Sequence, residues 1–181
     1  MLDAVAKVFT LRWGFLFCAA ASITGLATAV GLFTRRPPLA IIEQLLRWIH
    51  WDAATPALAA AAHWTSERSG SLAVGAVIAV LLGIGLTTFD GRGAALSVLG
   101  VSLDVQAGGH AALWIFTALG LMTLLAFVLA YFGPRRWFHE LDAIDSWCRS
   151  ACMQILAATF YLVVGRGAWI ADAAPRRPSW A

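Results

Sequence analysis

The chain has 181 residues, of which 60% are hydrophobic and 13% are charged, with a net charge of +3 and a mean hydropathy of +0.76. Soluble domains are about 45–50% apolar and about a quarter charged, so a water-soluble globule of this size could not bury so much apolar surface. Disordered chains are poor in the aliphatic and aromatic residues that dominate here. We therefore expect an all-α, polytopic membrane protein that forms a single transmembrane domain over residues 1–181.

Four apolar stretches are long enough to cross a bilayer as helices. A hydrocarbon core of about 30 Å requires about 20 helical residues. The first three stretches contain no charged residue, whereas the fourth is short and needs Arg149 or Arg166 to extend a long side chain to the headgroups. We expect the first stretch to be kept as a span because Arg35 and Arg36 follow it. The predicted spans are residues 13–33, 71–89, 111–132 and 150–166.

Two connections between spans have the pattern of short amphipathic helices in the membrane interface. In residues 39–52, apolar side chains recur at helical spacing while Glu43 and Arg47 occupy other positions. Residues 137–148 repeat this pattern, and an irregular loop is the alternative in both cases. The remaining connection, residues 90–110, contains five glycines. It predicts a flexible loop whose middle can touch the membrane.

Basic and indole side chains flank the predicted spans, where they are expected to anchor the protein at headgroup level. The two arginine pairs beside spans favour a cytoplasmic location for the amphipathic segments, whereas the basic flank before the first span, with Lys7 and Arg12, favours the opposite orientation. Twelve Arg against one Lys favours a GC-rich bacterial genome, and hence a bacterial inner membrane. The candidate anchors are Arg35, Arg36, Trp48, Trp51, Arg135, Arg136 and Trp137.

Small residues recur at helical spacing in the first two spans. Gly75, Ala79 and Gly83 follow one another at intervals of four, and Ala27 and Gly31 have the same spacing. Small side chains let helix backbones approach closely in lipid, where no hydrophobic force drives association. We predict a helix-packing or partner interface here, and a neighbouring span of the same chain is the alternative occupant. The hydroxyls of the spans are expected to bond carbonyls of their own helices.

The chemistry of the chain favours a structural role. The first three spans lack the ionisable groups that proton- or ion-coupled transport requires, and no catalytic, cofactor or metal motif is apparent. We expect a non-enzymatic small integral membrane subunit that scaffolds or anchors a larger complex or a homo-oligomer. Its partners would be membrane lipids and itself or other membrane subunits, not nucleic acid, because the arginines lie mostly beside apolar segments.

Two other functions remain open. A homo-oligomeric channel could be lined by the uncharged threonine faces of the first and third spans. A redox or metal protein could use the histidines with Cys148 and Cys152. Against the latter, His63 and His110 would lie on opposite membrane faces, and the cysteine spacing matches no zinc motif.

Overall fold

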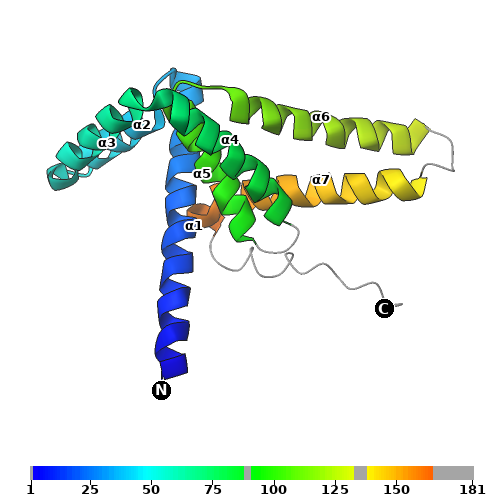
Figure 1. Ribbon diagram of the computed structural model, residues 1–181, viewed down its shortest axis with the longest axis horizontal. Helices are drawn as coiled ribbons and strands as arrows, with labels where there is room; N and C mark the ends of the chain where they lie inside the picture. Colours follow the sequence, from blue (N-terminus) through cyan, green and yellow to red (C-terminus); the bar gives the residue numbers. More distant parts are fainter. Residues whose placement is uncertain (1, 88–90, 133–137, 165–181) are drawn as a thin grey trace.

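The computed structural model describes residues 2–87, 91–132 and 138–164, and every regular element in these ranges is a helix. Figure 1 shows their arrangement. In chain order they are α1 (Leu2–Thr34), α2 (Pro38–Trp48), a short 3-10 helix η1 (Asp52–Ala54), α3 (Thr55–Glu67), α4 (Ser69–Leu86), α5 (Arg92–Gln106), α6 (Ala111–Phe132), α7 (Phe138–Thr159) and α8 (Tyr161–Val164).

Three helices are long and apolar enough to cross a membrane: α1 over Gly14–Thr34, α4 over Ser69–Leu86 and α6 over Ala111–Leu129. These correspond to the first three predicted spans, and the bounds of α6 coincide with the predicted 111–132. Between 17% and 33% of each stretch is buried inside the protein. Most of the surface of each stretch is therefore left uncovered by the described part of the chain.

The predicted fourth span and the second interfacial segment are not separate elements. Helix α7 begins at Phe138 and continues without a break to Thr159. It therefore contains most of the predicted interfacial segment, residues 137–148, and the first part of the predicted fourth span, residues 150–166. No proline or glycine lies inside α7 to interrupt it, and Arg149 forms an ion pair with Asp145 one turn earlier on the same helix. The division at residues 148–150 was therefore wrong.

The helix that was expected to continue to residue 166 instead ends at Thr159, and Ser22 of α1 occupies the break. Ser22 Oγ donates a hydrogen bond to the carbonyl oxygen of Thr159 at 2.8 Å and accepts one from the Leu162 amide at 3.2 Å. A helix end leaves such groups without intrahelical partners. The fully buried Ser22 side chain therefore stabilises the junction between α7 and α8.

The largest correction concerns residues 90–110, which were predicted to be a flexible loop. Residues 92–106 form α5, which contacts α1, α2, α3, α4, α6 and α7. Its buried residues are mostly small, among them Ala94, Ala95, Ser97 and Gly100. A helix surrounded by neighbours shows no amphipathic stripe, and its glycines serve close packing instead of flexibility. α5 is the central helix of the fold.

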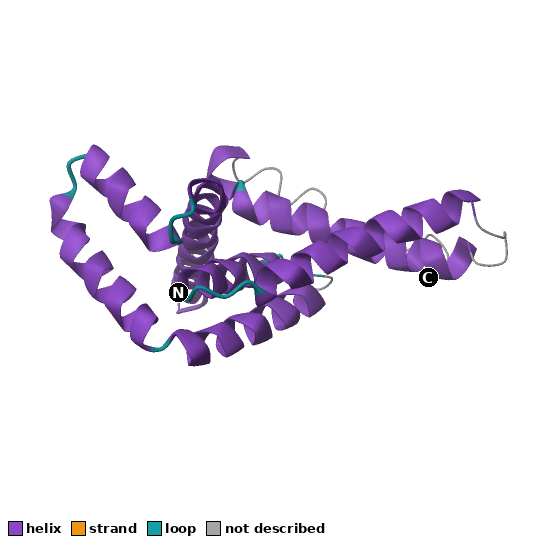
Figure 2. Cartoon of the chain, turned by 90° about the horizontal axis from the view of Figure 1, so that it is seen from above, coloured by secondary structure: helices purple, strands orange, loops and turns teal. Residues whose placement is uncertain are grey.

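Helices α2–α3 and α6–α7 extend to opposite sides of this centre. Figure 1 shows α2 and α3 on one side of the long α1, and the antiparallel pair α6–α7 on the other. Figure 2, turned by 90°, shows the same two arms. The sequence predicted a segment at 39–52 where α2 lies, but helix α3 was not foreseen. Pro38 at the first position of α2 favours helix initiation there.

Candidate functional site

The predicted small-residue stripe on α4 is divided between two environments. Gly83 is buried, and a Cβ built on it would lie 2.6 Å from the carbonyl oxygen of Gly93 and closer still to Ser97 Oγ. Gly75 is exposed and a Cβ there would meet nothing within 4 Å, while Ala79 is half-buried. The Gly83 end therefore packs against α5 of the same chain, and the Gly75 end leaves an open surface.

α5 contributes its own small residues to this contact. A Cβ on Gly93 would lie 2.7 Å from the Gly83 carbonyl oxygen, and one on Gly100 would lie 2.9 Å from that of Ala76. Gly93, Ser97 and Gly100 follow one another at helical spacing, so glycines of both helices face each other. Sequence reasoning missed this half of the interface, although the spacing was present.

On α1, the predicted packing residues serve contacts within the chain. Ala27 is buried. Gly31 lies at the turn into α2, where its carbonyl oxygen accepts a hydrogen bond from the Arg36 amide at 3.0 Å. A Cβ on Gly31 would lie 2.5 Å from the Arg36 carbonyl oxygen. Small size at this position allows the chain to turn closely after the span.

Buried polar groups join α5 to its neighbours. Thr28 Oγ1 of α1 and Ser102 Oγ of α5 are in hydrogen-bond contact at 2.9 Å. Each hydroxyl also lies within bonding distance of a carbonyl of its own helix, to Thr24 and Val98 respectively. The expected bonding within helices is therefore present, and bonds between helices, which were not predicted, are added to it.

The end of α5 supplies caps for two other helices. Asp104, which is fully buried, accepts a hydrogen bond from the Ala112 amide at 3.1 Å through Oδ2. Gln106 Oε1 accepts one from the Leu39 amide at 3.0 Å. Both amides lie in the first turn of a helix, α6 and α2 respectively, where backbone donors lack intrahelical acceptors and a carboxylate is favoured by the helix dipole. These caps set the directions in which the two arms leave the centre.

Of the predicted anchors that the structure describes, Arg35 and Arg36 lie at the α1–α2 turn, whereas Trp48 and Trp51 lie at and just beyond the end of α2. Trp48 and Trp51 are 77% and 58% exposed. Arg35 is exposed and has a positive φ of 56°, at the turn itself. Arg36 Nη1 donates a hydrogen bond to Gln44 Oε1 at 3.0 Å. The other three predicted anchors, Arg135, Arg136 and Trp137, lie outside the described residues.

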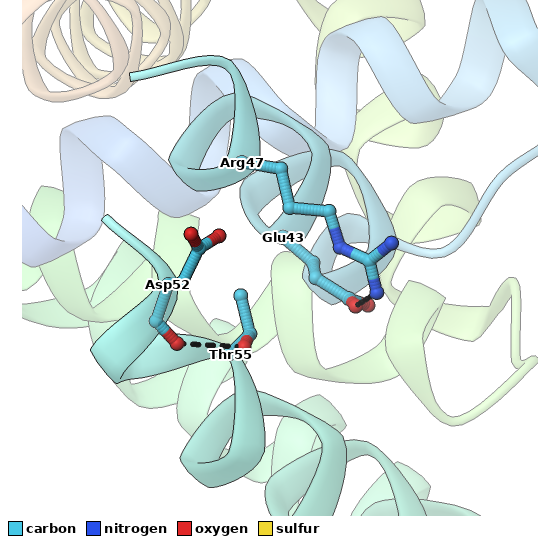
Figure 3. Close-up of polar contacts among 4 residues, drawn as sticks. All are labelled: Glu43, Arg47, Asp52 and Thr55. Atoms are coloured by element: carbon cyan, nitrogen blue, oxygen red, sulfur yellow. Dashed lines mark hydrogen bonds and ion pairs between the residues drawn. The ribbon is translucent and has the colours of Figure 1, made fainter. Parts of the chain in front are cut away.

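Acidic and basic side chains on α2 neutralise each other beside this turn. Arg47 Nη2 and Glu43 Oε1 are 2.6 Å apart, and Figure 3 marks this ion pair with a dashed line. In the same view Thr55 Oγ1 donates a hydrogen bond to the Asp52 carbonyl oxygen at 2.8 Å, which stabilises the turn at the start of α3. Because Glu43 is already paired with Arg47, among the described residues no carboxylate forms an ion pair with Arg36.

An open groove of about 1060 Å³ lies between α1 and α2, with Leu162 of α8 as part of its wall. Its lining is largely aliphatic, and the polar lining residues are Thr34, Arg36 and Gln44. Sites for small organic ligands have volumes of roughly 300–1,000 Å³ and combine apolar walls with a few polar groups. The groove has this character, and sequence reasoning did not predict it because its walls come from separate helices.

The histidines and cysteines do not assemble into a metal centre in the described part of the chain. No group of three or more His, Cys, Asp or Glu side chains there could hold a metal ion. Cys148 is buried and Cys152 half-buried, and Cys152 Sγ lies 4.0 Å from Thr123 Oγ1 of α6. These thiols therefore contribute to the contact between α6 and α7.

Comparison with protein families, with curated proteins and with solved structures finds no match for this chain.

Proposed function

We propose that this protein is a small, non-enzymatic integral membrane subunit that scaffolds or anchors a larger membrane complex or a homo-oligomer. The observation that carries the proposal is the open arrangement of its apolar helices. α6 contacts α4, α5 and α7 and then extends with α7 away from α1 (Figure 1). The spans thus do not enclose one another, and a partner helix would complete the bundle.

The exposed surface of α6 supports this role. Only 17% of its apolar stretch is buried, and large side chains project from it, including Leu121, Leu124, Leu125 and Phe127. On α4, Val74, Ile78 and Leu82 are also exposed. In a bilayer such surfaces contact lipid or other helices, and small residues such as Gly75 let a helix approach closely. We further propose a bacterial inner membrane and a fourth crossing that begins after Arg149 within α7 and continues through α8.

The experiment is extraction in mild detergent followed by native mass spectrometry and crosslinking. We expect a homo-oligomer or a co-purifying membrane protein. Ala79→Leu adds bulk at the half-buried centre of the α4 stripe and should weaken that assembly. Ala60→Leu, the same change at an exposed position of α3, is the matched control. A strictly monomeric particle without co-purifying protein would contradict the proposal.

A further inference from the structure

The groove between α1 and α2 has the character of a site for an amphiphile. The α1 wall includes Ile23 and Val30, and the α2 wall includes Ile41 and Leu45. Several of these side chains are about half exposed, namely Ile23 at 41%, Val30 at 47% and Leu45 at 52%. In water this surface would be costly, whereas an acyl chain would cover it.

The length of the groove along α1 corresponds to one leaflet of a bilayer. Its lining on α1 runs from Ile23 to Thr34, which is a helical rise of about 16 Å. Half of a hydrocarbon core of about 30 Å is about 15 Å. Thr34 is the last residue of the candidate span, so the polar lining groups lie at its headgroup end.

The charge at that end is positive. Arg36 is exposed, lines the groove and is held by Gln44. Arg35 precedes it, while the charge of Arg47 is balanced by Glu43. A guanidinium presents several donors in a fork that suits phosphate oxygens. Within the described residues no carboxylate pairs with Arg35 either, and this second cation beside Arg36 favours a headgroup with net negative charge.

We propose that the α1–α2 groove binds an anionic phospholipid, with the phosphate at Arg36 and one acyl chain along α1. This inference goes beyond the scaffold function and requires only that α1 lies in a membrane. The lipid would fill the space between the span and α2 and hold α2 at the headgroup level.

The test measures which lipids the purified protein retains. The full chain is reconstituted in vesicles of phosphatidylglycerol and phosphatidylcholine with identical acyl chains, extracted in mild detergent and weighed by native mass spectrometry. We expect preferential retention of phosphatidylglycerol. One basic residue near an anionic surface contributes about a fivefold preference, so Arg36→Gln should lower the preference by about that factor. Arg36→Lys should keep most of it.

Arg68→Gln is the matched control, because it changes the net charge equally but lies outside the groove lining, between α3 and α4. It should leave the preference unchanged. Val30→Trp should reduce retention of both lipids by filling the groove, whereas Val74→Trp, at an exposed position on α4, should not. Leu45→Trp repeats the block from the opposite wall if the Val30 variant fails to fold.

Four results would overturn the proposal. One is a wild-type protein without preference for phosphatidylglycerol. Another is an equal loss in the Arg36 and Arg68 variants, which would indicate a diffuse charge effect. The third is full lipid retention with either tryptophan in the groove. The fourth is a dimer that dissociates when the groove is filled, since a second copy would then be the occupant. This assay measures lipid bound to the purified chain, so a negative result would refute the lipid site alone. The scaffold function would instead be refuted by the absence of a protein partner or an oligomer.

Discussion

The contact between α4 and α5 should make two glycines of one helix respond oppositely to the same substitution. A Cβ on Gly83 would lie 2.6 Å from the Gly93 carbonyl oxygen and 2.7 Å from the Ser97 amide nitrogen, whereas Gly75 has open space. In Gly83→Ala the helices must therefore move apart. Overpacking of this kind costs about 1–3 kcal/mol, and a gap of 0.5–1 Å removes roughly a quarter to a half of each dispersion contact.

The Gly75→Ala variant provides the correction for helix propensity. Both substitutions replace glycine by alanine inside α4 and gain a similar propensity term of roughly 0.5–1 kcal/mol. The difference between the two variants thus isolates the steric term of about 1–3 kcal/mol. For a chain of this size that corresponds to a difference of roughly 2–10 °C in Tm.

Thermal unfolding in detergent, followed by the fluorescence of the nine tryptophans, measures this difference. We expect the Gly83 variant to unfold at the lower temperature. If it is at least as stable as the Gly75 variant, the close contact between α4 and α5 does not exist in the folded protein, and the central position assigned to α5 is wrong.

Two further predictions concern buried polar groups. Ser22→Ala leaves the Thr159 carbonyl and the Leu162 amide without their cross-helix partner, and should lower the free energy of unfolding by about 1–3 kcal/mol. Thr117→Ala removes a hydroxyl that bonds the Leu113 carbonyl of its own helix, and should lower Tm much less. Equal losses of Tm in the two variants would contradict the role assigned to Ser22. Asp104→Ala removes the cap of α6 and should lower stability by about 0.5–2 kcal/mol, while Asp104→Asn keeps an acceptor oxygen and should retain more of it. A Tm for the asparagine variant as low as that of the alanine variant would argue against the cap.

The membrane character and three of the spans could be predicted from the residues alone, because a bilayer requires about 20 consecutive apolar residues and that requirement is local. The α6 bounds were predicted to the residue. Arg35, Arg36 and Trp48 were predicted as anchors at headgroup level, and the structure has Arg35 at the α1–α2 turn and the other two in the lining of the groove. Their role at a membrane surface stays a prediction.

Only the tertiary structure assigned residues 92–106 to a buried central helix. From the local sequence alone, Gly93 and Gly100 are typical of a flexible loop. In the folded chain both pack closely against α4. The same holds for the end of α7 at Thr159, which depends on a serine of α1 that lies 137 residues away in the chain. Apolar length is encoded in consecutive residues, whereas close helix contacts and caps require pairs of residues distant in the chain, and a single sequence does not indicate which of them meet.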